Sequence, residues 1–593
     1  MATDPTYDVV IVGSGAAGGQ AAYTLTMAGA KVLMIEAGRR FDPATETAMF
    51  QTNGQAPLRG AGTPDKPLGF YDGTAGGGWS IPGEPYTNAS AEPDQQFMWW
   101  RSRMLGGRTN HWGRIALRFG PYDFKPYSRD GLGVDWPIAY EDIAPYYDKV
   151  EMLIGVCGAA EGLENSPDSP PGILLPAPKA RAGERLTAQR GKKLGLSVVP
   201  IHRAVLSTRQ DAETIPAKLH PNNPKAQRIL AEAMRQRAAC FWATDCHRGC
   251  SIKANYQSTT VHLPPALATG NLDLVTDAMV REVTVDKAGR ATGVVYIDKK
   301  TNEERAVRGR VIVLAAGSQE SVRILFNSKS GLFAQGLGNS SGLLGRYIMD
   351  TPASSLQGQI PALEGLPLHN EDGAGIHVYI PWEFYREQRT GKLDFPRGYH
   401  VQFTTGRQMP SARTGTGLEW LSGGTYGRQF KEDQRRYYGS LVGFSAIGEM
   451  VPNEHSYCDL DPVVKDRWGV PVLRFHWKWS EHEIRQAAHG QRMFADLIAA
   501  MGGRTKEPPA SNAAKALTRG GQIIHEVGGA RMGSDPKTSV TDPWSRTWEV
   551  KNLFIADGAT FASNADKNPT LTIMALAWRT SDYILEELRK GNL

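Results

Sequence analysis

The apolar and polar positions at the start of the chain predict a strand, a turn, a helix and a second strand. Residues 7–12 (YDVVIV) form a compact β-branched run, and residues 20–28 form an alanine-rich stretch that can coil into a helix. A glycine-rich turn, residues 13–18, lies between them, and the next apolar run, 31–36, ends in Glu36. The chain therefore opens on a strand–turn–helix–strand unit.

The glycine spacing in this unit is typical of a dinucleotide-binding turn. Gly13 permits the tight turn, Gly15 lets a pyrophosphate approach the backbone, and Gly18 allows close packing of helix on strand. The helix N-terminus supplies N–H donors to phosphate, and Glu36, 18 residues past Gly18, has the spacing of a ribose hydroxyl acceptor. An ordinary loop is the alternative for the glycines alone, but the complete unit predicts an adenine dinucleotide, FAD or NAD.

Two later stretches favour a large planar cofactor. Residues 103–113 (RMLGGRTNHWG) join a glycine pair to polar and aromatic residues, for which a nicotinamide dehydrogenase has no obvious use. Residues 552–558 (NLFIADG) read as a buried strand ending in an acid and a glycine, and residues 568–577 (NPTLTIMALA) as an N-cap, a proline and an apolar helix. The chain is expected to return to the cofactor there.

Composition excludes several classes of protein. The 593 residues suffice for several domains or two large ones, and 67 Lys and Arg against 61 Asp and Glu leave a mild net charge of +6 without a long basic block, so nucleic acid is not an expected partner. The longest apolar runs, such as 311–316, are too short for a membrane span, and residues 1–7 lack the basic start of a cleavable secretory signal. Five cysteines, an odd number, argue against a disulfide framework.

Seven ordered motifs spread over the whole chain resemble those of the glucose–methanol–choline (GMC) oxidoreductases. They are Gly13-x-Gly15-x-x-Gly18, Gly106-Gly107-x-x-x-His111-Trp112, Asp135-Trp-Pro-Ile followed by Tyr140-Glu-Asp, Val313-Leu-Ala-Ala-Gly317-Ser-x-Glu320, Gly345-Arg-Tyr-Ile-Met-Asp350, His525-Glu-Val-Gly528-x-x-Arg-Met-Gly533 and Asn568-Pro-Thr-Leu-Thr572. Within the family, the chain looks closest to bacterial sugar and glucoside 3-dehydrogenase flavoprotein subunits. Many members have His after the Asp of the fifth motif, where this chain has Thr351.

The resemblance implies an α/β fold with two parts. A Rossmann-like FAD-binding domain is assembled from residues 1–160, 240–350 and 520–593, and a substrate-binding domain with an antiparallel sheet from residues 161–239 and 351–519. Residues 50–95, rich in Gly, Pro, Asn and Asp, are expected to form an extended arm or lid.

The resemblance also assigns cofactor contacts over the whole FAD-binding part. The expected FAD-binding residues are Gly13, Gly15, Ala17, Gly18, Glu36, Ala37, Arg103, Gly106, Gly107, Thr109, Asn110, His111, Val280, Ala316, Gly317, Asp557, Gly558 and Thr570. The Gly-Gly-x-x-x-His-Trp segment also resembles the one through which pyranose oxidases attach flavin covalently to histidine. Whether His111 carries such a bond stays open.

Oxidation of an alcohol by a flavin needs a group that accepts the hydroxyl proton while hydride moves to flavin N5. His525 is the candidate, because imidazole is mostly neutral near physiological pH and the family's catalytic base occupies this position of the motif. The alternative is an ordinary core histidine. Asn568 matches the family's second catalytic position and can donate a hydrogen bond to the substrate oxygen, although an asparagine before proline is also an ordinary helix N-cap.

Cys240, Cys246 and Cys250 lie within eleven residues, with the spacing C-x5-C-x3-C. Three thiolates suit a 3Fe–4S cluster, and certain sugar dehydrogenase flavoprotein subunits of the family carry cluster cysteines at this spacing. The alternatives are zinc, which would recruit His247 or His262, and three packed or free thiols. A cluster would pass electrons singly to an acceptor such as cytochrome c, and the resemblance implies a small accessory subunit and periplasmic co-export; otherwise the protein would be cytoplasmic.

The pocket residues give a weaker indication of the substrate, which we expect to be a small sugar or glycoside. Glu449, His455 and Trp477 lie in the segment that shapes the family's pocket, and Glu449 is a candidate hydroxyl-binding carboxylate or else a solvated strand-edge charge. Three functions are then compatible with the sequence. The first is a dehydrogenase that oxidises a secondary hydroxyl, such as C3, or an anomeric hydroxyl; the others are an oxygen-reducing pyranose or C-glycoside oxidase and a non-catalytic flavin relay subunit.

Overall fold

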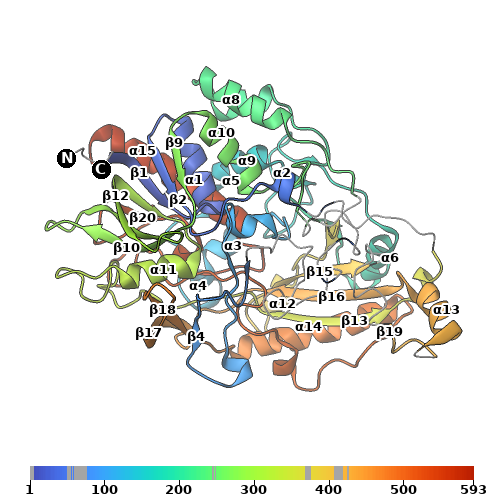
Figure 1. Ribbon diagram of the computed structural model, residues 1–593. Helices are drawn as coiled ribbons and strands as arrows, with labels where there is room; N and C mark the ends of the chain where they lie inside the picture. The colour runs from blue at the N-terminus through green and yellow to red at the C-terminus, as the bar shows by residue number, and fades with distance from the viewer. Residues whose placement is uncertain are drawn as a thin grey trace.

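A computed structural model describes residues 6–47, 49, 55, 58, 77–242, 246, 249–366, 375–405, 418–423 and 426–593. Two sheets with different strand arrangements lie at opposite ends of the view in Figure 1, and the C-terminus lies beside the first sheet. The predicted arm, residues 50–95, falls mostly outside the described residues; its described part contains only the short strands β3 (Gly77–Gly78) and β4 (Thr87–Asn88) and one turn of 3₁₀ helix.

The first sheet has seven strands drawn from three separated stretches of chain. Its parallel strands run in the order β20–β12–β1–β2–β9; β11 pairs antiparallel with the first half of β12, and β10 pairs antiparallel with β11. The bounds are β1 (Thr6–Val12), β2 (Val32–Ile35), β9 (Leu272–Val275), β10 (Ala278–Val285), β11 (Ala291–Asp298), β12 (Glu304–Leu314) and β20 (Leu553–Ile555). Burial on both faces explains why the parallel strands β2 and β20 and residues 311–314 of β12 are wholly apolar.

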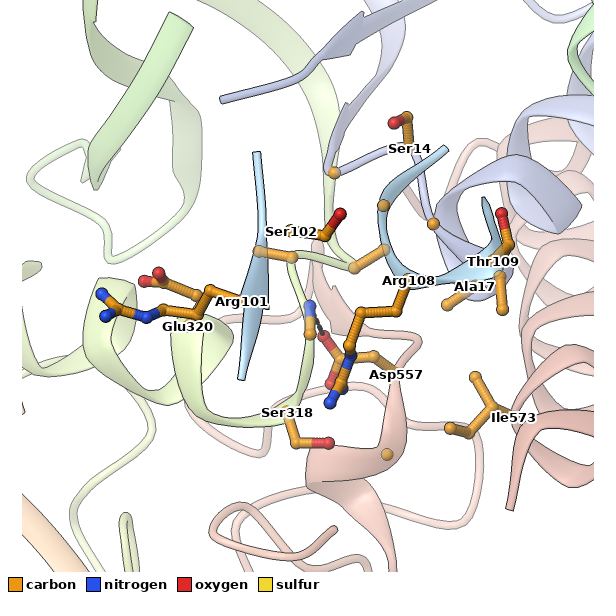
Figure 2. Close-up of a pocket in the computed structure, with 18 of the residues that line it drawn as sticks. Ser14, Ala17, Arg101, Ser102, Arg108, Thr109, Ser318, Glu320, Asp557 and Ile573 are labelled. Atoms are coloured by element: carbon orange, nitrogen blue, oxygen red, sulfur yellow. Dashed lines mark hydrogen bonds between the residues drawn. The ribbon is translucent and has the colours of Figure 1, made fainter. Parts of the chain in front are cut away.

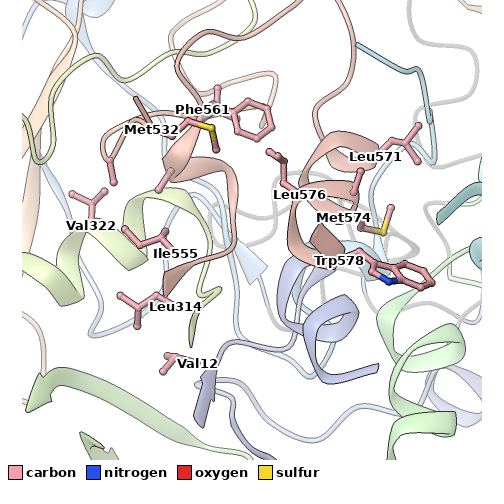
Figure 3. Packing of buried hydrophobic residues seen from close by; sticks show 14 of the residues in the cluster. Val12, Leu314, Val322, Met532, Ile555, Phe561, Leu571, Met574, Leu576 and Trp578 are labelled. Carbon is pink, nitrogen blue, oxygen red and sulfur yellow. The ribbon is translucent and has the colours of Figure 1, made fainter. Parts of the chain in front are cut away.

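Helices cover the faces of this sheet and close the main hydrophobic core. They include α1 (Ala16–Met27), α5 (Tyr140–Ile154), α11 (Ser318–Asn327) and α15 (Thr570–Lys590). Figure 3 shows Val12, Leu314 and Ile555 at the strand ends and Leu576 and Trp578 on α15, all of them buried. At roughly 25 cal/mol per Å² of apolar surface removed from water, such side chains stabilise the packing by about 1.5–3 kcal/mol each.

The second sheet is antiparallel and comes from the middle of the chain. Its order is β15–β16–β13–β19, with bounds Tyr399–Thr405, Leu441–Gly448, Ala353–Gln359 and Arg504–Thr505. Helix α14 (Glu481–Ala500) packs against it through Phe494, Leu497 and Ile498, and the Ser480 hydroxyl caps its N-terminus. The predicted α/β class, with one parallel sheet from separated segments and one antiparallel sheet, is confirmed.

The remaining longer elements complete the surface around the two sheets. They are α6 (Ala182–Gly191), α7 (Thr214–Leu219), α8 (Pro224–Arg235), α10 (Leu263–Ala268), α13 (Gly427–Tyr437), β17 (Tyr457–Lys465) and β18 (Pro471–His476). Of the helices that the structure describes, none combines the length and the apolar character that crossing a membrane requires.

Candidate functional site

A cavity of about 350 Å³ lies at the carboxyl ends of β1, β2, β12 and β20. This is the edge of a parallel sheet at which cofactors and substrates bind. Most of the residues assigned from the sequence line it: Gly13, Gly15, Ala17, Glu36, Ala37, Arg103, Gly107, Thr109, His111, Val280, Ala316, Gly317, His525, Asp557, Gly558, Asn568 and Thr570. Figure 2 shows Ala17, Thr109 and Asp557 around this space.

The turn between β1 and α1 uses its glycines in three different ways. Gly13 has φ +99°, and a Cβ there would lie 2.4 Å from the Ala315 carbonyl oxygen. A Cβ on Gly18, which does not line the cavity, would meet the Gly13 carbonyl oxygen at 1.9 Å, so Gly18 serves packing. A Cβ on Gly15 would meet nothing within 4 Å and would instead project into open space.

A second glycine turn faces the first. The short helix η4 (Gly107–Asn110) follows Gly106, whose N–H donates to the Ser14 hydroxyl at 2.8 Å. Asn110 braces this turn from behind, donating to the Leu105 and Gly107 carbonyls at 2.9 and 3.0 Å. Gly106 and Asn110 therefore hold the cavity wall in place without lining it, whereas Gly107 faces Gly15 across the cavity.

The carboxylate at the end of β2 is held firmly. Glu36 Oε2 accepts the N–H and the hydroxyl of Ser14, at 3.0 and 2.5 Å, and Oε1 accepts the Gly38 N–H at 2.6 Å. Burial raises the pKa of Glu36, although these hydrogen bonds favour the charged form. The carboxylate lines the cavity in the position of a ribose acceptor, and its lone pairs are not exhausted by three donors.

These features fit an FAD. Helix α1 has no side-chain cap at its N-terminus, so its first N–H groups are directed at the place where a pyrophosphate would lie. The gap that Gly15 and Gly107 leave would be filled by any larger side chain. Asp557, which accepts from Gly317 N–H at 3.1 Å and from Ser321 Oγ, joins the ends of β12 and β20 beneath the same space.

The two predicted catalytic side chains meet in this cavity. The amide nitrogen Nδ2 of Asn568 lies 3.1 Å from Nε2 of His525, and Thr351 Oγ1 lies 3.1 Å from the other ring nitrogen, Nδ1. Helix α15 has no side-chain cap, so Asn568 does not serve as the N-cap that sequence alone allowed. His525 is likewise no ordinary core histidine, because its ring borders the cavity.

The surroundings keep His525 neutral. Burial lowers its pKa to about 3, and the neighbouring His400 and Arg108 push in the same direction. The Asp350 carboxylate accepts the backbone N–H groups of His525 and Gly521 at 3.1 and 2.7 Å and so anchors the segment that carries the ring. A neutral imidazole with a lone pair facing the cavity can accept a proton.

The sequence argument missed an ion pair inside the cavity. Arg108 Nη1 lies 2.5 Å from Oε1 of Glu526, the residue after His525, and both side chains line the cavity. Figure 2 shows the Arg108 side chain extending toward Asp557. Arg108 sits inside a motif that was recognised, so the motif could have identified it; Ser14, between Gly13 and Gly15, was missed in the same way.

His111 lies in the cavity wall with a defined partner. The indole N–H of Trp100 donates to His111 Nε2 at 3.0 Å, and the two rings are 5.6 Å apart in an edge-on arrangement. An indole nitrogen only donates, so Nε2 must accept and carries its lone pair toward Trp100. Covalent attachment through Nε2 would require this contact to break.

The residues assigned to the substrate lie elsewhere. Glu449 is 2% exposed, pairs with Arg129 Nη2 at 2.9 Å and with Arg397, and is not among the residues of the cavity. Burial raises its pKa, but the two arginines outweigh burial and hold the pKa below the usual range. Glu449 is therefore neither a hydroxyl-binding group of the cavity nor a solvated charge, the two expectations from the sequence. It belongs to a buried structural ion pair.

His455 and Trp477 are also outside the cavity. His455 lies exposed in a turn before β17, and Trp477 is buried against Phe97, with ring centroids 4.9 Å apart. From β15 of the antiparallel sheet, Gln402 contacts Asn568, and His400 contacts Gln402; neither lines the cavity. No motif marked these two residues in the sequence.

The three cysteines gather in one small apolar region. Cys240 packs with Cys250 and Met49 on one side and with Cys246 and Val205 on the other. Residues 243–245 and 247–248 of this loop, His247 among them, lie outside the described residues. In the described part of the chain no three His, Cys, Asp or Glu side chains are arranged to hold a metal ion, and the His262 ring contacts the Tyr256 hydroxyl at 3.2 Å. The cluster stays a prediction.

Comparison with known proteins agrees with the fold and the cavity. The large subunit of fructose dehydrogenase from Gluconobacter japonicus is 28% identical over 600 residues, which cover 98% of each chain. A 2-methyl-1,2-propanediol dehydrogenase from Mycolicibacterium austroafricanum is 27% identical over 588 residues, 97% of this chain and 95% of that one. A solved formate oxidase from Aspergillus oryzae shares the fold, with a TM-score of 0.61 at 14% identity over 99% of this chain and 100% of that one.

Family assignment rests on matches that span most of the sequence. The family model described as GMC oxidoreductase matches residues 7–340 at the N-terminal side and residues 452–577 at the C-terminal side. The chain therefore belongs to the GMC oxidoreductase family, whose members bind FAD, and is an oxidoreductase.

Proposed function

We propose that this protein is an FAD-dependent dehydrogenase that oxidises a secondary hydroxyl, such as C3, or the anomeric hydroxyl of a sugar or glycoside. One observation carries the proposal: His525 Nε2 and Asn568 Nδ2 lie 3.1 Å apart in the cavity that the two glycine turns line. A proton acceptor beside a hydrogen-bond donor matches the needs of one carbinol oxygen. The names of the relatives, a fructose dehydrogenase and a dehydrogenase of a branched diol, support a polyhydroxylated substrate.

The roles of the chain's own residues follow from their chemistry. In place of the direct His525–Asn568 contact, a substrate hydroxyl beside both nitrogens would donate to His525 Nε2 and accept from Asn568 Nδ2, which fixes its oxygen and points its C–H bond away from them. His525 takes the hydroxyl proton as the carbonyl forms, and Asn568 holds the oxygen while its charge changes. FAD, when bound, accepts the hydrogen of the C–H bond together with its two electrons.

Anaerobic flavin bleaching tests the proposal directly. The holoprotein would be mixed without oxygen with D-glucose, methyl glucoside, D-fructose, a C-glycoside or 2-methyl-1,2-propanediol. We expect at least one sugar to bleach the flavin absorbance, and product analysis then identifies the oxidised carbon. Bleaching by none of the sugars would contradict the proposed substrate class and would favour the non-catalytic relay subunit.

The acceptor of the electrons separates a dehydrogenase from an oxidase. Steady peroxide formation under air, without an added acceptor, would favour the oxygen-reducing pyranose or C-glycoside oxidase. Turnover with cytochrome c or a one-electron dye, together with slow reaction under air, is the outcome expected of the dehydrogenase.

For the route of the electrons, we propose a 3Fe–4S cluster on Cys240, Cys246 and Cys250, with a small accessory subunit and periplasmic co-export. Two observations support it. The three thiols lie in adjoining apolar contacts, and Arg114 bridges the loop to the cofactor turn, donating to the Cys246 and Asn110 carbonyls at 3.1 and 2.9 Å. The similar fructose dehydrogenase chain is named a large subunit, which supports a partner subunit here. Iron analysis and low-temperature EPR test this part, and an iron-free, fully active preparation would defeat it.

A further inference from the structure

Strand β15 presents two polar side chains to the catalytic pair. His400 and Gln402 are two residues apart on this strand and therefore lie on one face of the antiparallel sheet. His400 is 1% exposed, and its two ring nitrogens contact the Asp566 backbone carbonyl and Gln402 Nε2, the latter at 2.9 Å. Gln402 Nε2 also lies 3.5 Å from Asn568 Oδ1. A line of hydrogen bonds thus reaches Asn568 from the antiparallel sheet.

The direction of this line is fixed at its far end. The Asp566 carbonyl can only accept, so the contacting nitrogen of His400, Nδ1, carries the proton. In a neutral ring Nε2 then accepts, and its partner must be the amide N–H₂ of Gln402. The second N–H of that amide donates to Asn568 Oδ1, which leaves the Asn568 N–H₂ group facing His525.

The same direction continues through His525. An amide N–H₂ only donates, so His525 Nε2 accepts and Nδ1 carries the ring proton. Thr351 is 1% exposed, and its hydroxyl oxygen lies 3.1 Å from His525 Nδ1. With the proton on Nδ1, the hydroxyl accepts a hydrogen bond from Nδ1–H. The His525 tautomer thus follows from the Asp566 carbonyl, which lies beyond three side chains of the line.

We propose that Thr351, Gln402 and His400 are positioning residues that set the direction of one hydrogen-bond line, so that His525 presents the Nε2 lone pair, and Asn568 its N–H₂ group, to the substrate hydroxyl. This inference rests on the proposed function. It also gives a role to Thr351, where many family members have histidine: the short threonine side chain carries a hydroxyl that can accept a hydrogen bond from His525 Nδ1–H.

The charges around the line allow it to persist near neutral pH. Burial lowers the pKa of His400 to about 4, with Asp566 opposing and Lys567 reinforcing the shift, so His400 is neutral. The buried Lys567 ammonium is itself paired with Asp123 at 3.0 Å and with Asp566 at 2.5 Å. On the His525 side the facing titratable groups are Arg108, paired with Glu526, and Asp350, whose pKa burial raises to about 7.

A matched pair of substitutions at residue 351 tests the proposal in the holoprotein. Thr351→Val keeps the shape and removes the acceptor, whereas Thr351→Ser keeps the hydroxyl. We expect Thr351→Val to lower the plateau rate of anaerobic flavin bleaching by about tenfold or more at unchanged KM, FAD content and melting temperature, and Thr351→Ser to restore the rate. Gln402→Glu, which replaces the donor by an acceptor, should lower the plateau similarly. Equal rates for Thr351→Val and Thr351→Ser would overturn the proposal.

A second readout does not depend on turnover. Ring-¹⁵N-labelled histidine, with the His525 signals assigned by their loss in His525→Gln, reports which nitrogen carries the proton. We expect the Nδ1–H tautomer in the wild type and in Thr351→Ser, and a mixture with Nε2–H in Thr351→Val. Nε2–H in the wild type would refute the positioning line even if sugars bleach the flavin. Nδ1–H in a protein that no sugar reduces would leave the line standing and reject the proposed substrate class.

Discussion

The two ends of the cavity are built in different ways. At the end near β1 and β2, backbone groups form most of the wall. One strand–turn–helix–strand unit supplies Gly13, Ser14, Gly15, Gly18 and Glu36 there. At the catalytic end, side chains from four distant segments converge, at residues 351, 400–402, 525 and 566–568. At the first end, binding of the cofactor depends on the space that the glycines leave. At the second end, the reaction rate depends on the direction of the hydrogen bonds.

This difference predicts different failures. Adding atoms at Gly15 should remove the cofactor and leave the fold, because the added side chain enters open space. Changing a donor or acceptor at the catalytic end should leave the cofactor and remove the rate, because the packing is unchanged. The predictions below test that division, from the largest expected effect to the smallest.

The largest effect is expected at the proton acceptor. His525→Gln should retain a yellow, FAD-loaded protein and lose about 10²–10⁴-fold in the rate of anaerobic flavin bleaching by a sugar substrate, the range typical of a general base. Stopped-flow absorbance measures it, with FAD content per chain as the control. Near-normal bleaching in this variant would remove the proton-transfer role of His525.

The next effect is expected when a side chain fills the space beside the position of the pyrophosphate. Gly15→Val should fold normally, since nothing lies within 4 Å of the added Cβ, but should lose about tenfold or more in FAD affinity because the side chain occupies the cavity. The measurement is FAD titration of deflavinated protein. Gly331→Val is the matched control, because Gly331 also has open space around a Cβ and lies outside the cavity. Equal FAD affinity in the two variants would contradict the assignment.

A buried ion pair outside both ends should affect stability alone. Glu449→Gln removes one of the two carboxylates that Arg129 and Arg397 share and leaves them Asp130, and removing one partner of a buried pair costs about 3–5 kcal/mol. We expect a lower midpoint of chemical unfolding together with an unchanged KM. A raised KM at unchanged stability would return Glu449 to the role of a substrate-binding group.

The smallest effect is a pH dependence of stability. The pKa of His525 falls from 6.5 to about 3 and that of His400 from 6.5 to about 4, so the unfolded chain binds more protons between these values. The free energy of unfolding that depends on these two neutral rings is present in full above pH 6.5. It is lost as pH falls toward 3–4, by up to about 1.4 kcal/mol per pH unit for each group. His525→Gln should reduce the acid slope of the unfolding free energy, and an unchanged slope would contradict this contribution.

The sequence predicted those parts of the molecule in which function follows from neighbours in the chain. The glycine turn, Glu36 and the apolar strands are local patterns, and the His525 and Asn568 positions came from motifs. His400, Gln402 and Thr351 could not be found this way, because their role appears only when β15 is brought beside α15. The prediction for Glu449 was wrong because its partners are distant in the sequence. The segment around Glu449 does not indicate that Arg129 and Arg397 pair with its carboxylate.

A structure of the holoprotein with a bound sugar or an unreactive sugar analogue tests the central claim most directly. The account predicts one ring or anomeric oxygen within hydrogen-bond distance of both His525 Nε2 and Asn568 Nδ2, with the adjacent C–H bond facing the flavin. A sugar whose oxygens contact neither side chain, or a flavin bound away from the two glycine turns, would contradict it.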